Sequence, residues 1–525
     1  MNSVFCADIG TSSLKAALVD FSGRVLAFSR VQFGLFYTDH AAGEWLGALR
    51  KALAGCISFV GGGADICATA NIRATAGTGV SFANTGASGQ GTQISIDAIC
   101  ISGNGPTLCG VDGKTLLWNA DLGLGANTAN TASTDVSFAN TGTSGTDCSS
   151  GTSGANTAAS SANTGISGNT ADICATAGTG SANICATANT AVPSANTKSL
   201  YIPRILGFAK KFPSYWQQKD CTVFSGPEYL IYLLTGASVS ILPEKRFLEA
   251  YWSREAFKEA GLSAEDAEDA MQKLPSFVPP ASIAGSLTKT AAEFLCGGEG
   301  ECAVGLVKDG IPVVCGAPDF ISALVGTNTL RAGLFCDRAG SSEGINLCTS
   351  KPVAGQGIRT LPSIIPGLWN ASVLLPESGE RFCAYKEKIS HLYARPISLD
   401  EMVQILLESD GSLAELDQGK YLMLQTAMMV RDGLNALRRA AEESGAVPAL
   451  KTEMTVTGGQ AENALWNQMK ANVTGYTLYT QSLVHAELTG DAVFALLALG
   501  LYKDIHSAAA AVCKREVCYE PQEVS

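Results

Sequence analysis

The sequence predicts an α/β protein with two large domains. Its 525 residues exceed the roughly 250–300 at which a single hydrophobic core stops growing, so two large domains are expected. Short apolar runs typical of β-strands alternate with segments whose apolar residues recur at helical spacing, and glycine-rich turns join them. Two low-complexity segments, at about 61–93 and 123–197, interrupt this pattern.

The first sixty residues predict three antiparallel strands followed by a helix. The expected strands are 4–9, 14–20 and 24–31. Asp20-Phe21-Ser22-Gly23 has the residue types of a tight turn between the second and third strands. In 43–56, Trp45, Leu46 and Leu49 fall on one helical face, so this segment is expected to be a helix.

The alternation of strands and helices continues outside the low-complexity segments. Further strands are expected at 94–102, 108–111, 311–316, 333–338, 344–349 and 453–457. Further helices are expected at 202–210, 228–234, 320–325, 421–443 and 461–473. Gly236 follows the helix at 228–234 and is the usual residue for ending it. Ala317-Pro318-Asp319 is expected to form a turn between strand and helix.

The two low-complexity segments share short words of sequence at no fixed period. Ala64–Ala70 recurs as Ala171–Ala177, and Ser81–Gly86 recurs as Ser137–Gly142. Irregular spacing argues against a stacked solenoid and for one repeat unit inserted at two places. Ala, Gly, Ser, Thr and Asn bury too little apolar area to offset roughly 1–2 kcal/mol of ordering entropy per residue. We expect flexible surface insertions in the N-terminal domain; irregular β-rich structure and a partner-binding surface are the alternatives.

Composition excludes several classes of protein. The net charge of -12 argues against a nucleic-acid or anionic-membrane surface, which normally presents a basic stripe. The 17 cysteines are odd in number and lack the spacing of a disulfide or zinc framework, so reduced thiols are expected. We find neither a signal-peptide pattern nor an apolar run of 18 residues. These features predict a cytoplasmic protein.

The first candidate site is the turn between the first two strands, Asp8-Ile9-Gly10-Thr11-Ser12-Ser13-Leu14-Lys15. Glycine and small hydroxyl residues let backbone amides approach phosphate oxygens, Lys15 adds a positive charge, and Asp8 can hold a hydrated Mg²⁺ ion. The alternative is an ordinary hairpin with a polar tip. The stretch is not a Walker A loop, because no G-x-x-x-x-G-K-[ST] opens a helix there.

The second candidate is Asp319, which lies just beyond the strand at 311–316. Carboxylates at the C-terminal ends of strands in α/β proteins lie where ligands bind, and one near a substrate hydroxyl can act as general base. The alternative is a helix N-cap. Two further turns, Gly340-Ser341-Ser342 and Gly458-Gly459-Gln460, are rich in glycine and could approach a phosphate chain and a flat ring.

The order and spacing of these motifs resemble the FGGY-type carbohydrate kinases of the actin-like ATPase superfamily. The resemblance covers nearly all residues outside the two low-complexity segments. Besides the motif at residues 7–15, it rests on Ile101-Ser102-Gly103-Asn104-Gly105-Pro106-Thr107, Tyr229–Gly236, Gly316-Ala317-Pro318-Asp319, Gly340-Ser341-Ser342-Glu343-Gly344, and Gly458-Gly459 followed by Trp466.

The resemblance implies two actin-like, ribonuclease-H-like α/β domains that flank a cleft, at 1–326 and 327–525. Members of the family use MgATP, bound in this cleft, to phosphorylate a hydroxyl of a ketose, polyol or sugar acid. The implied ligands are therefore ATP, Mg²⁺ and a small sugar or polyol, with neither nucleic acid nor membrane as a partner. The sequence is also compatible with a homodimer.

The resemblance also implies roles for the residues that match the family's motifs. Asp319 would be the general base and would contact the sugar, together with Asn104, Trp118 and Asp121. The nucleotide would contact Thr11, Ser12, Ser13, Lys15 and Ser341 through its phosphates and Gly458, Gly459 and Asn463 through its adenine. Asp8 would belong to the Mg²⁺ site.

One departure from the family's pattern motivates an alternative function. Family members often carry a Trp-x-Asp-x-Arg element that helps to hold the sugar. Here Trp118 and Asp121 are present, but Gly123 takes the position of the arginine. The alternative is an actin-like nucleotide-binding protein without sugar kinase activity, its sugar pocket disrupted by the insertion.

Overall fold

The computed structural model describes residues 1–34, 39–60, 94–120, 122, 198–297, 306–340 and 342–522. The predictions made for 61–93 and 123–197 lie outside these residues, and so do the roles proposed for Asp121 and Ser341.

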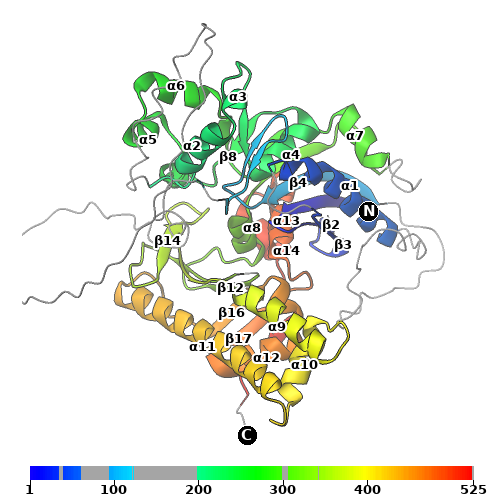
Figure 1. Cartoon of the computed structure of the whole chain (residues 1–525), viewed down its shortest axis with the longest axis vertical. Helices are drawn as coiled ribbons and strands as arrows, with labels where there is room; N and C mark the ends of the chain where they lie inside the picture. The colour runs from blue at the N-terminus through cyan, green and yellow to red at the C-terminus, as the bar shows by residue number, and fades with distance from the viewer. Residues whose placement is uncertain are drawn as a thin grey trace, which may run out of the picture. The chain divides into compact units, whose positions relative to one another are not determined.

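The first large sheet is built mainly from the N-terminal half of the chain (Figure 1). Its strands, in spatial order, are β10 (Ile283–Ser286), β11 (Pro312–Pro318), β4 (Ser95–Gly103), β1 (Asn2–Ile9), β2 (Ser13–Asp20) and β3 (Val25–Gln32). Strands β1, β2 and β3 pair antiparallel, and β4 pairs parallel to β1 and to β11. Seven of the eight residues of β1 are buried, as its apolar sequence predicts.

The second large sheet repeats this arrangement with the C-terminal half. Its strands, in spatial order, are β14 (Arg359–Pro362), β15 (Trp369–Leu375), β13 (Glu343–Thr349), β12 (Phe335–Ala339), β16 (Glu453–Thr457), β17 (Thr477–Thr480) and β18 (Val517–Tyr519). Here β12, β13 and β15 pair antiparallel, and β16 pairs parallel to β12. In the first sheet β1 lies between antiparallel β2 and parallel β4, and in the second sheet β12 lies between antiparallel β13 and parallel β16, which is the duplicated arrangement expected of two ribonuclease-H-like domains.

Helices and two small sheets complete the described structure. The N-terminal part holds α1 (Trp45–Val60), α2 (Ile202–Lys211), α3 (Pro213–Trp216), α4 (Gly226–Thr235), α5 (Arg254–Glu259), α6 (Ala264–Gln272), α7 (Lys289–Cys296) and α8 (Asp319–Gly326), with the 3₁₀ helices η1 (Ala41–Glu44) and η2 (Lys245–Glu249). The small sheets are β6 (Thr115–Leu116), β5 (Leu108–Gly110) and β7 (Val223–Ser225), and β8 (Val239–Ile241) with β9 (Ser276–Val278). The C-terminal part holds α9 (Ser378–Leu392), α10 (Leu399–Glu408), α11 (Ala414–Glu443), η4 (Gly459–Glu462), α12 (Ala464–Thr474), α13 (Ala486–Ala498) and α14 (Ile505–Val512).

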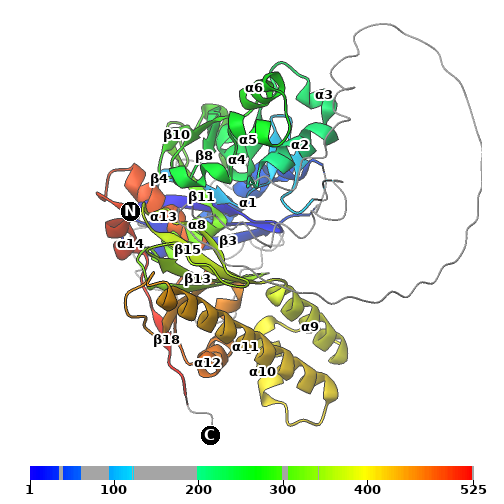
Figure 2. The ribbon, with the colours of Figure 1, turned by 90° about the vertical axis from the view of Figure 1, so that its left-hand side faces the viewer.

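Each large sheet has its own buried core. Aromatic and aliphatic residues of α1 and α4, including Trp45 and Leu230, cover one face of the first sheet. The long helix α11 crosses one face of the second sheet, with α9, α10 and α12 packed near it (Figure 2). The apolar stripes of these helices are buried against the sheets, as amphipathic helices require.

The helix α13 belongs to the C-terminal part of the sequence but packs on the first sheet and on α8 (Figure 1). The two helices approach so closely that they need glycine at the contact. A Cβ atom on Gly490 would lie 2.0 Å from the carbonyl oxygen of Ser322, and one on Gly326 would lie 1.9 Å from that of Ala486. This contact fixes α13 against α8, the helix that begins at Asp319. The domain boundary at 326/327 stays a prediction.

Most predicted elements are confirmed to within a few residues, and three predictions need correction. The helix expected at 421–443 begins earlier, at Ala414. The helix expected to open directly after Gly459 begins at Ala464, because residues 459–462 form η4. The turn expected at 317–319 does not exist, since β11 runs through Pro318 and α8 begins at Asp319.

Two local signals worked as expected. The Asp20 carboxylate accepts hydrogen bonds from the backbone N–H groups of Ser22 and Arg24, and Gly23 has a φ of 86°, which closes the tight turn. Gly236 has a φ of 75° and ends α4.

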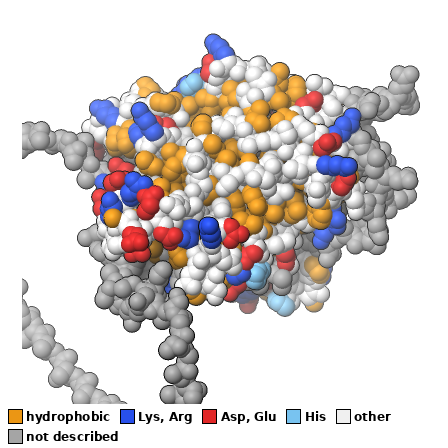
Figure 3. Space-filling view, turned by 90° about the horizontal axis from the view of Figure 1, so that it is seen from above, with side chains coloured by type: hydrophobic (Ala, Val, Ile, Leu, Met, Phe, Trp, Pro, Cys, Tyr) orange, Lys and Arg blue, Asp and Glu red, His pale blue; other side chains and the backbone are white. Residues whose placement is uncertain are grey.

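The surface of the described residues carries charges of both signs. On the face in Figure 3, Lys and Arg side chains lie beside Asp and Glu side chains, and no basic stripe gathers among its coloured residues. Among the helices that the structure describes, none combines the length and the apolar character needed to cross a bilayer.

Candidate active site

A single cavity of about 880 Å³ brings together residues of both large sheets. A volume of this size suits a small-molecule ligand. The predicted site residues that line it are Asp8, Thr11, Ser12, Ser13, Lys15, Asn104, Trp118, Asp319, Gly458, Gly459 and Asn463. For Asp121 and Ser341, which the structure does not describe, the described neighbours Leu122, Gly340 and Ser342 also line the cavity.

The Thr11 hydroxyl connects the two groups of predicted residues. Its oxygen accepts a hydrogen bond of 2.6 Å from the Asn104 amide and one of 2.9 Å from the Trp118 indole N–H. A hydroxyl with both acceptor positions occupied still has its own proton to donate. Thr11 can therefore donate to an anionic ligand in the cavity while it holds the two residues expected to contact the sugar.

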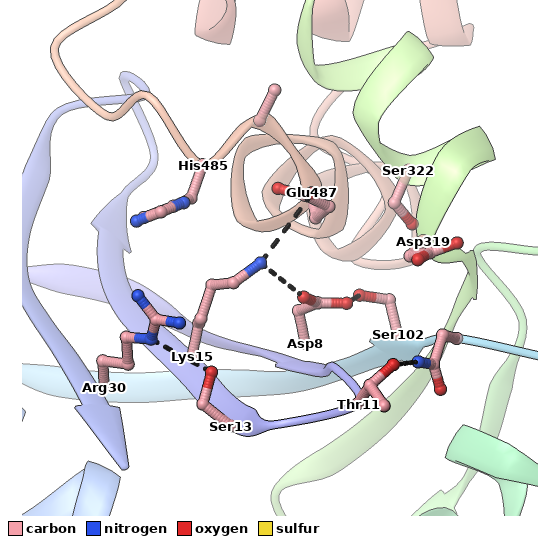
Figure 4. A network of polar contacts seen from close by, with 12 residues as sticks. Asp8, Thr11, Ser13, Lys15, Arg30, Ser102, Asp319, Ser322, His485 and Glu487 are labelled. Atoms are coloured by element: carbon pink, nitrogen blue, oxygen red, sulfur yellow. Dashed lines mark hydrogen bonds and ion pairs between the residues drawn. The ribbon is translucent and has the colours of Figure 1, made fainter. Parts of the chain in front are cut away.

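Lys15 lies between the carboxylates of Asp8 and Glu487 (Figure 4). Its Nζ is 3.1 Å from Oδ2 of Asp8 and 3.8 Å from Oε1 of Glu487, which comes from the start of α13. Burial by itself lowers the pKa of Lys15, but the charges of Glu487 and Asp8 outweigh it and raise the pKa above its ordinary value. Lys15 is therefore a fixed positive charge.

The pKa of Asp8 is raised to about 6, because burial and the negative charges of Glu487 and Asp319 together outweigh the lowering effect of Lys15. In Glu487, burial raises the pKa, but the lowering effects of Lys15, His485 and Arg338 and of a backbone hydrogen bond together outweigh burial, so the pKa lies below its ordinary value. Its Oε2 atom is buried without a hydrogen-bond partner among the described residues. This part of the cavity thus has several carboxylates around one lysine.

Asp319 is the first residue of α8, directly after β11. Its Oδ1 accepts a hydrogen bond of 2.6 Å from the backbone N–H of Phe320, and the N-cap position belongs to Pro318. Burial raises the pKa of Asp319, while the positive charge of Arg338 on β12 opposes the rise. The carboxylate lines the cavity, so the N-cap alternative does not account for its position.

A buried carboxyl on α13 supports both Asp8 and the helix of Asp319. Asp491 accepts hydrogen bonds of 2.7 Å from the Ser102 hydroxyl and 3.2 Å from the Ser322 hydroxyl, and Ser102 also lies 3.5 Å from Asp8. Burial, reinforced by the charge of Asp8, raises the pKa of Asp491 far above its ordinary value. Through these hydrogen bonds, the Asp491 carboxyl links β4, α8 and α13 behind the cavity.

The turns of the second sheet lie at the other side of the cavity. Gly458 has a φ of 95°, and a Cβ atom there would lie 2.5 Å from the carbonyl oxygen of Ala339, so only glycine fits. The Gln460 side chain donates a hydrogen bond of 3.1 Å to the carbonyl oxygen of Gly340. The two glycine turns therefore lie next to each other, as a site for one nucleotide requires.

Asn463 has a structural task that the sequence did not reveal. It is the N-cap of α12, where its Oδ1 accepts a hydrogen bond of 2.7 Å from the N–H of Trp466 and its Nδ2 donates to Asp400 over 2.6 Å. It also lines the cavity, so capping and ligand contact are compatible.

An arginine from a different element lies where the sequence lacks one. Arg204 on α2 lines the cavity, and its Nη1 donates a hydrogen bond of 2.7 Å to the carbonyl oxygen of Leu117, next to Trp118. Burial lowers the pKa of Arg204 to about 10, so the group still carries its charge at neutral pH.

Sequence reasoning missed several residues that line the cavity: Arg30, Arg204, Arg338, Arg359, His485 and Glu487. Arg30 donates a hydrogen bond of 3.0 Å to the Ser13 hydroxyl from the neighbouring strand (Figure 4). His485 stacks on Phe28 at 5.0 Å, and burial lowers its pKa. Arg30 could have been found from the sequence, because it is a polar residue in the expected strand at 24–31. Glu487 could not, because an acidic residue in the first turn of a helix is common and does not by itself indicate a site.

The chain is similar in part of its sequence to a curated kinase. No protein-family model matches the chain. An autoinducer-2 kinase from Enterobacter sp. (strain 638) is 25% identical over 264 residues, which is 43% of this chain and 47% of that protein. The match therefore spans about half the length of this curated relative.

Solved carbohydrate kinases match nearly the whole chain in structure. A gluconate kinase from Lactobacillus acidophilus has a TM-score of 0.61 at 12% identity, over 99% of this chain and 94% of that one. The glycerol kinase of Plasmodium falciparum gives the same four values, and a xylulose kinase from Lactobacillus acidophilus gives a TM-score of 0.60 at 12% identity over the same shares. These comparisons confirm the resemblance to the FGGY-type carbohydrate kinases, and the chain has their two-domain actin-like α/β fold.

Proposed function

We propose that the protein transfers a phosphoryl group from ATP to a hydroxyl of a small carbohydrate, with Asp319 as general base. The observation that carries this proposal is the shared cavity, which is lined by Asp319, by the hydroxyl-rich turn at residues 10–13 and by the paired glycine turns at 340 and 458. Phosphoryl transfer needs mainly positioning and charge neutralisation, and these groups supply both.

In the proposed reaction, the acceptor hydroxyl gives its proton to the Asp319 carboxylate. The oxygen forms a bond to the γ-phosphorus, and the bond between this phosphorus and the β,γ-bridging oxygen breaks, so the products are ADP and a phosphate ester. The raised pKa of Asp319 supports this role, because a more basic carboxylate accepts a proton more readily.

Thr11 and Lys15 would hold the phosphate chain from the side of the first sheet. The Thr11 hydroxyl has a proton left to donate, and Lys15 is a fixed charge between Asp8 and Glu487. The backbone at Gly340 and Ser342 would face the same phosphates from the other side, where Ser341 is also expected to contribute. The Gly459 backbone and Asn463 would border the adenine.

The residues around Asp8 fit a hydrated Mg²⁺ ion held mainly by the nucleotide. After burial, the negative charges of Glu487 and Asp319 raise the pKa of Asp8, and this cluster of negative charge favours a cation there. Among the described residues no three His, Cys, Asp or Glu side chains converge closely enough to hold a metal themselves, which suits an ion that keeps most of its waters. When bound, the ion neutralises charge on the phosphates; Asp8 would orient its waters.

Asn104 and Trp118 would contact the sugar from the side opposite the nucleotide. Both side chains are fixed by Thr11, so the same residue would align sugar and phosphate. We propose that Arg204 takes the place of the arginine missing at Gly123, because it reaches the cavity beside Trp118.

The proposal is tested by offering ketoses, polyols and sugar acids with MgATP and measuring ADP release. Asp319→Asn is expected to lower kcat by roughly 10²–10⁴-fold. ATP binding, measured by calorimetry, should persist in this variant. The matched control is Asp309→Asn, which removes an exposed carboxylate outside the cavity and should leave kcat unchanged.

Turnover that survives in Asp319→Asn would remove Asp319 from the mechanism. ATP binding without turnover on any member of the panel would favour the alternative, a nucleotide-binding protein without sugar kinase activity.

A further inference from the structure

Two arginines on the second sheet line the cavity without a hydrogen bond or salt bridge to another described residue. Arg338 lies on β12 and Arg359 opens β14, and both line the cavity. Neither guanidinium forms a hydrogen bond or a salt bridge with another described residue, and the Nε atom of each is buried. Both side chains are half-buried, and a buried Nε–H group without an acceptor is costly, so an anionic ligand in the cavity is the simplest explanation.

The register of the sheet places Arg338 and Arg359 on the same face, although β12 and β14 are not neighbouring strands. Arg338 lies opposite Gly344, whereas Arg359 lies opposite Ser372, which itself lies opposite Asn346. Gly344 and Asn346 are two residues apart on β13, so both arginines project from the same face of the sheet.

Gly344 leaves space for the Arg338 side chain to lie across β13. A Cβ atom at Gly344 would lie 3.0 Å from Nη2 of Arg338. The two charges are close enough to interact: burial lowers the pKa of Arg359, and the charge of Arg338 lowers it further. A ligand with negative charge between them would relieve both effects.

Polar groups on the strands between the two arginines add to this surface. Asn346 and Asn370 are joined by a hydrogen bond of 3.2 Å, and Oδ1 of Asn370 is buried without a partner among the described residues. Ser372 lies beside them on the same face and also lines the cavity. Together these side chains can receive the hydroxyls that accompany an anionic group.

The position of the pair points to the carbohydrate rather than the nucleotide. Arg338 lies 5.9 Å from the ring of Phe320, next to Asp319, and its charge acts on that carboxylate. The strand order is β14-β15-β13-β12-β16, so β14 lies roughly 14 Å from β12 at about 4.8 Å per strand. The turn at 458–463 follows β16, on the other side of β12.

We infer that Arg338 and Arg359 form a subsite for an anionic group of the carbohydrate, so that the substrate is a polyhydroxy acid or a sugar phosphate. The inference rests on the proposed kinase function, because it names the substrate class of that site. Arginine suits this task, since its planar fork binds a carboxylate or a phosphate through two parallel hydrogen bonds.

The test compares matched substrates that differ only in the anionic group. Four- to six-carbon aldonates are each offered with the alditol of the same stereochemistry, and hexose 6-phosphates form a separate arm. We expect at least one anionic member to exceed its neutral counterpart at least 100-fold in kcat/KM. The arm that responds distinguishes a carboxylate from a phosphate ester.

Arg338→Met and Arg359→Met should each raise KM for the preferred anion at least tenfold and leave KM for ATP within twofold of wild type. Arg359→Lys, which keeps the charge but loses the fork, should lie between Arg359→Met and wild type. Arg439→Met, on the exposed face of α11, is the control for the loss of an arginine. Thermal unfolding curves identify any variant that fails to fold.

Two results would overturn the inference. One is a preference for neutral sugars that neither Arg338→Met nor Arg359→Met changes, and the other is that these variants raise KM for ATP and leave KM for the carbohydrate unchanged. If no compound is turned over, calorimetry separates the subsite proposal from the kinase proposal. Each anionic compound is titrated into the protein in the presence of a non-hydrolysable ATP analogue. Binding of an acid that both Met variants abolish would support the subsite while the kinase function fails. Absence of binding by every anionic member would refute the subsite.

Discussion

The close contact between α8 and α13 makes Gly490 a sensitive test of how the site is held together. In Gly490→Ala, the new Cβ would lie 2.0 Å from the carbonyl oxygen of Ser322. Such atoms essentially never lie closer than 3.0 Å, so the helices must separate by about 1 Å. Both atoms belong to or adjoin the backbone, and no change of rotamer can relieve the clash.

The expected free-energy change is the difference of two effects. Overpacking of this kind costs about 1–3 kcal/mol, and a clash with backbone belongs at the upper end. Alanine gains up to about 1 kcal/mol over glycine in a helix. We therefore expect Gly490→Ala to lower the free energy of unfolding by about 2 kcal/mol. Since α8 begins at Asp319, a shift of 1 Å should also lower kcat by up to about 100-fold.

Gly47→Ala is the matched control, because it makes the same change inside α1. A Cβ atom at Gly47 meets nothing within 4 Å, so this variant should be more stable than wild type by up to about 1 kcal/mol. Urea unfolding and ADP release are measured for both variants. If Gly490→Ala were as stable and as active as wild type, the close packing of α8 on α13 would be refuted.

Three further changes test other parts of the structure. Lys470→Met removes the partner of two carboxylates, 2.7 and 2.9 Å away and fully buried, so urea unfolding should show a loss of about 3–5 kcal/mol; a loss under 1 kcal/mol would contradict the buried ion cluster. Burial raises the pKa of Glu228 from 4.5 to about 7, so the folded state binds the proton more tightly and the stability of wild type falls as pH rises between these values. Glu228→Gln should remove this fall in the free energy of unfolding, which is at most about 3 kcal/mol. If the variant kept the pH dependence of wild type, Glu228 would not be its source. Thr11→Val leaves two donors without their acceptor and should lower kcat/KM at least tenfold, in contrast to Thr11→Ser, which keeps the hydroxyl.

Local sequence predicted the elements whose signals lie within a few residues. The tight turn at 20–23 and the end of α4 at Gly236 formed as predicted, because their backbone geometry depends on residues that are neighbours in the chain. The helix after β16 was misplaced because Asn463, not Gly459, caps it, and a cap is recognised only once its hydrogen bonds are known.

The resemblance carried by short motifs predicted the two-domain fold and a set of residues that the structure brings into one cavity, Asp8, Thr11 and Asp319 among them. Asp319 lies more than 300 residues after Asp8 and Thr11, yet each lies in a motif whose glycines and small residues mark a turn beside a strand. Such motifs can be read without the structure, because the backbone there needs particular residue types.

By itself the sequence determined the strands, the turns and the motif residues, since these follow from local hydrophobic pattern and backbone conformation. Only the tertiary structure brought Glu487 to Lys15, Arg204 to Trp118, and Arg338 to the face that also carries Arg359. Charged side chains of this kind are ordinary on a protein surface. What makes them part of a site is the low-dielectric cavity and the partner that folding places opposite them, and neither is encoded by neighbours in the chain.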